Sequence, residues 1–114
     1  MTECETGDIV LVWFPFTDLA TTKKRPAVVL SPRAYADRLG DIVLMPLTSQ
    51  IEQDASLALS HWKASGLAKP TWVKPIIGTI SMRLIERRLG RLTDADEPCV
   101  HAALATLLAD RWIA

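Results

Sequence analysis

Two polar residues stand where apolar segments meet loops, and both are of types that bind phosphate. Arg25 lies between a polar loop and an apolar run, next to Lys23 and Lys24, and Thr48, followed by Ser49, stands where another apolar run ends. An arginine can bind a phosphate through two parallel hydrogen bonds, and a threonine hydroxyl can donate one more. Small β-proteins place function at strand ends and in the loops beyond them, so an anion site is one interpretation. The ordinary alternatives are a surface arginine before a proline and a turn threonine that satisfies the backbone.

Other familiar chemical motifs are missing from the sequence. It contains no catalytic-triad signature, no HExxH, no P-loop and no Gly-x-Gly-x-x-Gly. Cys4 and Cys99 lack the spacing of a zinc site or of a disulfide framework. His61 and His101 are lone histidines, for which a structural role or plain exposure is the better interpretation. The sequence therefore predicts no metal ion and no cofactor.

The charge of the chain is balanced overall but not locally. With 13 basic and 13 acidic side chains the formal net charge is zero, which argues against a protein that coats nucleic acid through charge alone. Residues 58–92 depart from this balance, because one carboxylate, Glu86, stands there among seven basic side chains: Lys63, Lys69, Lys74, Arg83, Arg87, Arg88 and Arg91. This stretch is either a phosphate-binding face or a solvated strand edge protected by positive charge.

The elements that would position these residues are mostly short strands. Runs of apolar and β-branched residues between turn signals predict strands at residues 9–14, 27–30, 42–45 and 86–92, with a half-buried strand at 56–59. Residues 71–80 predict one edge strand that Pro75 interrupts. Single helical turns are expected at residues 32–39 and 83–85. Short strands without long helices between them are typical of a barrel or a sandwich.

The C-terminal residues change period and predict a closing helix. Apolar side chains recur there at helical spacing, at Val100, Leu104, Leu107, Leu108 and Trp112. The helix would begin either at a capping box from Thr93 to Asp96 or at Asp96 itself, with Pro98 in the first turn. No linker or repeat divides the chain, so a single domain, 1–114, is expected.

The N-terminus predicts no export signal. It is acidic where a signal peptide would be basic and then apolar. The longest apolar runs, residues 9–16 and 102–109, are too short to span a bilayer. The expected location is cytoplasmic.

Segments along almost the whole chain follow, in order, the sequence pattern of one known family: residues 7–15, 25–31, 43–49, 65–67, 70–74 and 89–92. Arg-Pro-Ala-Val-Val-Leu-Ser at 25–31 and Pro-Leu-Thr-Ser at 46–49 are the most specific of these segments when they occur together. On these segments the chain resembles the MazF/PemK family of toxin ribonucleases.

The resemblance implies a mainly β fold, an SH3-like small barrel of five to seven short strands with a C-terminal α-helix. It also implies a homodimeric toxin of a type II toxin–antitoxin system, held inactive by a cognate antitoxin protein. Such a toxin is an endoribonuclease that cuts single-stranded RNA at short motifs. Arg25 and Thr48 would be its catalytic pair, with the loop at residues 17–24 contacting RNA. Four further residues would bind RNA: Lys23, Lys24, Ser49 and Lys74.

The implied chemistry needs no metal ion. The neighbouring 2′-hydroxyl attacks the phosphate and leaves a 2′,3′-cyclic phosphate and a 5′-hydroxyl. Arg25 stays protonated at neutral pH, so it suits charge stabilisation better than base catalysis. Some family members carry a carboxylate close after the basic residue that Lys74 matches, but here Pro75 and Ile76 follow. Which group takes the 2′ proton is therefore open.

Two other functions compete with RNA cleavage. A relative of CcdB would poison DNA gyrase by binding it through apolar C-terminal residues, and this chain ends in Trp112, Ile113 and Ala114. A small interaction module would bind proline-rich peptides through exposed aromatic side chains. Aromatic residues make up 6% of the chain, which disfavours the module.

Overall fold

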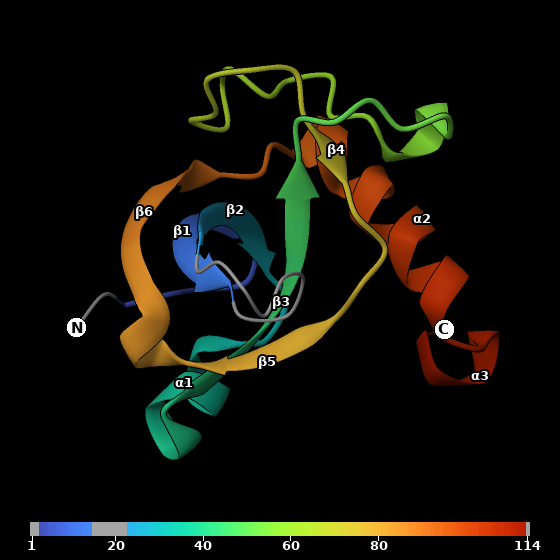
Figure 1. Ribbon diagram of the computed structural model, residues 1–114. Coiled ribbons are helices and arrows are strands. Elements are labelled where there is room, and N and C mark those ends of the chain that lie inside the picture. The colour runs from blue at the N-terminus through green and yellow to red at the C-terminus, as the bar shows by residue number, and fades with distance from the viewer. Residues whose placement is uncertain (1–2, 15–22, 114) are drawn as a thin grey trace.

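The computed structural model describes residues 3–14 and 23–113, and these form one antiparallel sheet of six strands with a helix beside it (Figure 1). The strands are β1 (Asp8–Phe14), β2 (Lys23–Val29), β3 (Asp41–Thr48), β4 (Trp72–Val73), β5 (Gly78–Ser81) and β6 (Ile85–Arg91). The helices are α1 (Arg33–Leu39), α2 (Glu97–Leu107) and α3 (Asp110–Ile113). Three 3₁₀ turns complete the described elements: η1 (Ala55–Leu57), η2 (Met82–Leu84) and η3 (Asp94–Asp96). The predicted fold class is confirmed.

The sheet curls into a partly open barrel. Its strand order is β4-β3-β2-β1-β6, and β5 pairs with the first half of β3 while β4 pairs with its end. Residues 72–81 thus make one edge, interrupted near Pro75 as the sequence predicted. Between β5 on this edge and β6 on the other there is only the three-residue turn η2, so the two edges are brought together without pairing in the described sheet (Figure 1).

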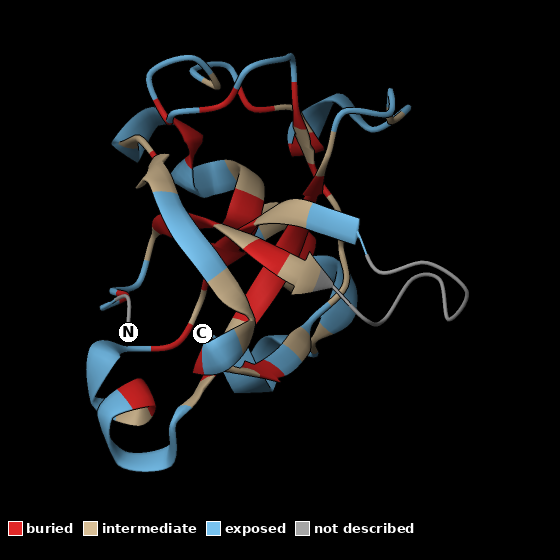
Figure 2. Cartoon of the chain, turned by 60° about the vertical axis from the view of Figure 1, so that its left-hand side comes forward, coloured by how far each residue is buried: buried red, intermediate tan, exposed pale blue. Residues whose placement is uncertain are grey.

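Both faces of the central strands are buried (Figure 2). Alternate side chains point to opposite faces of a strand. One set fills the barrel and includes Val10, Val12, Ala27, Val29 and Leu44. The other set includes Ile9, Val28, Met45 and Leu47 and packs against Val100 of α2. Because full burial of one such side chain contributes roughly 1.5–3 kcal/mol, these two clusters stabilise the frame from which the loops project.

Two strands are longer than predicted, and the difference moves the candidate residues. β2 begins at Lys23, so Arg25 lies inside the strand, opposite Val12, and not at a hinge before it. β3 continues through Pro46 and ends at Thr48. Both candidates therefore stand on hydrogen-bonded strands, which orient side chains more rigidly than loops do.

The predicted strand at residues 56–59 is wrong. Asp54 accepts hydrogen bonds from the backbone N–H of Ser56 (2.9 Å) and from its hydroxyl (2.6 Å), and this cap starts η1 instead. Ala58 keeps one isolated bridge to Trp72. The alternation of apolar and small residues at 56–59 still predicted correctly which side chains are buried, since Leu57 and Leu59 both are.

The closing helix is shorter than its apolar stripe suggested. Val100 is buried as expected, but α2 stops at Leu107, because the backbone of Leu108 is extended. Trp112, on the separate turn α3, is 73% exposed. No helix in the described part of the chain is long and apolar enough to cross a membrane.

Candidate functional site

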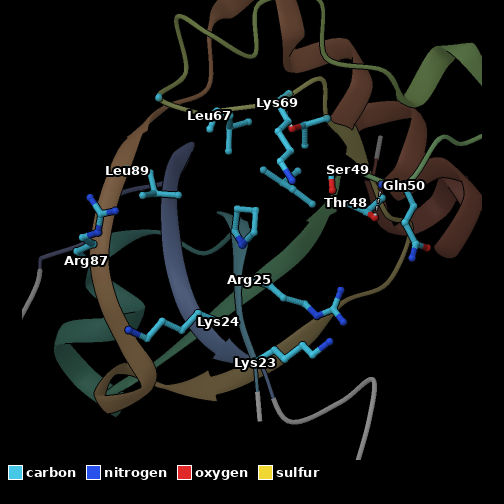
Figure 3. A pocket seen from close by; sticks show the side chains of 15 residues that line it. Lys23, Lys24, Arg25, Thr48, Ser49, Gln50, Leu67, Lys69, Arg87 and Leu89 are labelled. Atoms are coloured by element: carbon cyan, nitrogen blue, oxygen red, sulfur yellow. Dashed lines mark hydrogen bonds between the residues drawn. The ribbon is translucent and has the colours of Figure 1, made fainter. Parts of the chain in front are cut away.

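An open pocket of about 520 Å³ lies where β2 emerges from the core (Figure 3). Four segments line it: the first residues of β2, the end of β3 with the two residues after it, residues 66–71, and the middle of β6. Arg25, Thr48 and Ser49, predicted from separate parts of the sequence, share this pocket. Lys23 and Lys24 line it as well.

The lining of the pocket is strongly cationic. It includes Lys23, Lys24, Arg25, Lys69 and Arg87, and no carboxylate or imidazole occurs among the lining residues that the structure describes. A concave surface with one sign of charge concentrates counter-ions and steers them inward. The pocket therefore suits an anion, and its open form suits part of a polymer better than a small enclosed ligand. We call it the cationic pocket.

The register of the sheet explains how Pro26 of β2 and Arg87 of β6 come to line the same pocket. Leu11 of β1 pairs with Pro26 on one side and with Arg87 on the other. Directly opposite residues of antiparallel strands point to the same face, so Pro26 and Arg87 share a face of the sheet. The side chain of Arg25 lies on the opposite face of the sheet, together with those of Val29 and Ala27. Val29 and Ala27 are buried, whereas Arg25 is half-buried at the rim of the core.

Thr48 presents a hydroxyl that can donate into the pocket. Its Oγ1 accepts a hydrogen bond from the backbone N–H of Gln50 at 3.1 Å. Across residues 3–14 and 23–113 its own hydroxyl proton has no acceptor. Arg25 is half-buried and forms no ion pair with any described residue. Figure 3 shows Arg25 and Lys23 extending toward the side of the pocket that carries Thr48 and Gln50.

Lys24 is held differently from its neighbour Arg25. Its Nζ lies 3.1 Å from Glu86 Oε1 and 4.9 Å from the centre of the Trp13 ring. The Trp13 indole N–H donates to the same carboxylate at 3.3 Å. The hydrogen bond and the charge of Lys24 hold the pKa of Glu86 below its ordinary value. Lys24 thus belongs to a clamp between β2 and β6, and points toward β6 in Figure 3.

The structure does not bring Lys74 into the cationic pocket. Its backbone N–H donates to the carbonyl oxygen of Pro46 at 2.9 Å, and its half-buried side chain is absent from the pocket lining. Of the loop expected to contact RNA, residues 17–24, all but Lys23 and Lys24 lie outside the described residues.

Sequence reasoning missed Lys69 and Arg87 as pocket residues. The signal was present in the basic stretch 58–92, but that stretch is not one face. Arg88 and Arg91 pair instead with the buried carboxylate of Asp8, at 3.3 and 3.1 Å. Nothing in the sequence separates these two groups, because the separation follows from the path of β6.

A serine, a histidine and an aspartate also meet outside the pocket, but not as a catalytic triad. Asp96 accepts hydrogen bonds from the backbone N–H groups of Ser60 and His61, both at 2.8 Å, and from the Ser60 hydroxyl at 2.7 Å. Because the Ser60 proton goes to Asp96, His61 Nδ1, 3.0 Å from Ser60 Oγ, can only donate to that oxygen. The imidazole therefore cannot act as the base for this serine.

The same contacts explain the ionisation of Asp96. Burial alone would raise the pKa of this carboxyl, but the hydrogen bonds from Ser60 and His61 outweigh burial and lower it. Asp96 thus holds the segment that leads into the pocket-lining residues 66–71. In the described part of the chain no group of three or more His, Cys, Asp or Glu residues could hold a metal ion.

The family described as PemK-like, MazF-like toxin of type II toxin–antitoxin system matches residues 5–108. Among solved structures, a chain of MazE–MazF from Deinococcus radiodurans is 19% identical with a TM-score of 0.72, over 93% of this chain and 97% of that chain. The Mycobacterium tuberculosis toxin MazF-mt6 is 20% identical with a TM-score of 0.70, over 87% and 93%. A mycobacterial endoribonuclease in complex with its cognate antitoxin is 21% identical with a TM-score of 0.67, over 93% of each chain. None of the curated proteins matches the sequence.

Proposed function

This chain belongs to the family of PemK-like, MazF-like toxins of type II toxin–antitoxin systems, and on that premise we propose that it is a metal-independent endoribonuclease that cuts single-stranded RNA. The observation that carries this function is the cationic pocket, in which Arg25 and Thr48 meet without any carboxylate in the described lining. A polyanion is the natural occupant of such a surface. The proposed substrate, messenger RNA, agrees with the expected cytoplasmic location.

The chemistry assigned to the two residues follows from their contacts. The 2′-hydroxyl adjacent to the bound phosphate loses its proton to water and attacks phosphorus, and the bond to the 5′-oxygen breaks as that oxygen takes a proton from water, which gives a 2′,3′-cyclic phosphate and a 5′-hydroxyl. Arg25 stabilises the charge that builds up on the phosphate oxygens in the transition state. Thr48 donates a hydrogen bond from its hydroxyl to one of these oxygens, while its Oγ1 accepts one from the backbone N–H of Gln50. Both groups are thus assigned to the phosphate and not to the attacking hydroxyl.

The residues of the pocket also bear on general base catalysis. The position that matches the basic residue of some family members, Lys74, lies outside the cationic pocket and is followed by Pro75. The described lining offers no carboxylate or imidazole to take the 2′ proton. Catalysis here is accordingly assigned to charge stabilisation and positioning.

The proposed partners are a cognate antitoxin and a second copy of the chain. Complexes with MazE and with a cognate antitoxin are known for structures of this fold. An acidic antitoxin segment that folds along the cationic pocket would block it by charge complementarity. Apolar side chains that a homodimer could cover include Leu39, Ile51, Leu107 and Trp112.

The test is cleavage of a long mixed-sequence single-stranded RNA in excess EDTA, with the ends of the products mapped. We expect discrete cuts with 2′,3′-cyclic phosphate ends. Arg25→Ala and Thr48→Val, which removes the hydroxyl at nearly constant shape, should each lower the cleavage rate by about 100-fold. Arg83→Ala, an exposed cation outside the pocket, is the matched control and should cut like the wild type. Absence of cleavage by folded wild-type protein would refute the proposed activity.

A gyrase-binding toxin is the second candidate, because α3 exposes Trp112 (73%) and Ile113 (36%) near the end of the chain. Deletion of residues 112–114 separates the two functions. RNA cleavage should survive this deletion, since none of the described residues in it packs in either core cluster. Gyrase poisoning that is lost on deletion, in a protein that leaves RNA intact, would favour the second candidate.

A further inference from the structure

The charged side chains of the cationic pocket suit the phosphates of any RNA sequence. They are lysines and arginines, and Thr48 is assigned to the scissile phosphate. Contacts to phosphate position a nucleic acid but carry no information about its bases. A base of single-stranded RNA is identified instead by hydrogen bonds to its Watson–Crick and Hoogsteen edges. Because donors and acceptors lie side by side on these edges, a group that reads one of them should both donate and accept.

Amide side chains meet this requirement, and the chain contains few of them. An amide presents an acceptor oxygen beside a donor nitrogen, and glutamine in this way forms two hydrogen bonds with adenine. The 114 residues include no asparagine and two glutamines, Gln50 and Gln53, so residues 15–22, which the structure does not describe, contain neither. Gln50 lines the cationic pocket, whereas Gln53 is absent from its lining. Gln50 is thus the amide side chain that this chain places in the pocket.

The backbone holds Gln50 next to Thr48. β3 ends at Thr48, which pairs with Trp72 of β4. The backbone N–H of Gln50 donates to Thr48 Oγ1 at 3.1 Å, and a threonine side chain bonded in this way fixes the residue two positions later in a turn. The side chain of Gln50 therefore starts from a fixed point close to the hydroxyl that is assigned to the scissile phosphate.

The side chain of Gln50 is available to a ligand. It is exposed, and its amide forms no hydrogen bond with any residue in 3–14 and 23–113. Figure 3 shows it beside Thr48, on the side of the pocket toward which Arg25 extends. A base next to a phosphate held by Arg25 and Thr48 would thus meet an amide whose donor and acceptor are both unused.

Two other uncharged polar residues in the described lining, Ser49 and Thr71, suit base recognition less well. The buried Thr71 already donates its hydroxyl proton to the carbonyl oxygen of Lys69 at 2.8 Å. Ser49 offers a single rotating hydroxyl, which can donate to one base and accept from another and so distinguishes them poorly.

We propose that Gln50 selects the base next to the scissile phosphate by pairing with its edge through the side-chain amide, with adenine as the preferred base. This role rests on the ribonuclease function proposed above and adds to it a source of sequence preference. Because Gln50 is held at Thr48, its amide acts on a nucleotide that adjoins the phosphate bound by Arg25 and Thr48. Gln50 determines specificity and takes no part in bond cleavage.

The test maps the cuts of the wild type and of Gln50→Ala in the same long mixed-sequence single-stranded RNA and counts the bases around them. We expect the wild type to prefer adenine at one of the two positions that flank the cut. In Gln50→Ala, cleavage at adenine relative to the other bases of that position should fall by about 10- to 100-fold. Preferences at the remaining positions should persist, and because Gln50 is exposed the variant should fold like the wild type.

Two further variants sharpen the test. Gln50→Glu keeps the length of the side chain, but a carboxylate only accepts, so the preferred base at the same position should change from adenine to cytosine, whose amino group donates. Gln53→Ala is the matched control, because Gln53 is an exposed glutamine three residues further on and outside the pocket. This control should cut at the sites of the wild type.

The outcomes separate the role of Gln50 from the proposed function. An unchanged motif in Gln50→Ala, or a cleavage rate that falls equally at every site, overturns the assignment, since a purely structural role would lower all rates alike. The same loss of preference in Gln53→Ala overturns it too. In each of these cases cleavage by the wild type still upholds the ribonuclease. A folded wild type that leaves RNA intact refutes the function itself.

Discussion

At the scale of residues, the charged side chains of this toxin divide into paired and unpaired groups. Asp8, Glu86 and Asp96 each satisfy several donors from distant segments. Arg25, Lys69 and Arg87 have no such partner among the described residues. Paired groups stabilise the fold, whereas unpaired cations in a concave site are available to a ligand. The division separates Lys24 from Arg25 although they are neighbours in sequence.

Asp96 gives a prediction about stability and pH. Asp96→Asn places an amide where three donors now meet a carboxylate, so at pH 7 we expect the free energy of unfolding to fall by about 1.5–3 kcal/mol. The folded-state pKa of Asp96 is lowered, so its stabilisation is complete above the unfolded value of about 3.9 and is lost as pH falls through the folded value. The gap between wild type and variant should therefore close under acid conditions, as measured by urea unfolding at pH 7 and at pH 3.

Asp94→Asn is the matched control for this experiment. Asp94 lies two residues earlier in the same turn, η3, and is exposed. Its replacement should change stability little at either pH. A gap for Asp96→Asn that widened on acidification would contradict the role assigned to the carboxylate.

At the scale of elements, β6 shows how local irregularity creates a site. Its register shifts twice against β1, with Glu86 and Leu89 as the extra residues. In a regular strand Arg88 and Arg91 would point to opposite faces, yet here both reach Asp8. Arg87 is thereby left facing the pocket.

Gly66 lies directly on β6 at Gly90, and this backbone crossing gives a prediction at this scale. Gly66→Ala adds a collision with the Leu89 carbonyl to the strain of a positive φ. Gly40→Ala is the matched control, since Gly40 has a φ of +72° with no atom near its Cβ position. The control should cost about 1–2 kcal/mol from strain alone, and Gly66→Ala about 1–3 kcal/mol more. Equal losses in chemical denaturation would show that the crossing can relax.

The sequence predicted elements far better than it predicted contacts. Period and turn residues located the strands near residues 9–14, 42–45 and 86–92, since these signals are local. The bulges of β6 left no such signal, so Arg87 and Arg88 could not be told apart. At residues 56–59 the side chain of Asp54 accepts hydrogen bonds from Ser56 and so favours a 3₁₀ turn over strand pairing. The alternation of apolar residues carries no information about such a hydrogen bond. Asp96 occupies the expected N-cap position, but its side chain bonds Ser60 and His61 and not its own helix.

At the scale of the molecule, a chain of zero net charge carries one concentrated cationic pocket. An acidic antitoxin segment that occupies it would compete with RNA for the same cations. We expect the affinity of the cognate antitoxin to fall steeply as salt rises from about 0.05 to about 0.5 M, because salt screens every ion pair between the acidic antitoxin segment and the cations of the pocket. Isothermal titration at several salt concentrations measures this dependence. Affinity that stayed constant over that range would show that apolar contacts, and not the cationic pocket, hold the antitoxin.

The placement of β1 between β2 and β6 has a consequence for synthesis on the ribosome. β1 completes its pairing with β6 only when Arg91 has been made. The cationic pocket likewise needs residues from both ends of this interval, from Lys23 to Leu89. Pairings between such distant segments form late. A growing chain therefore cannot form the cationic pocket until the ribosome has synthesised Leu89.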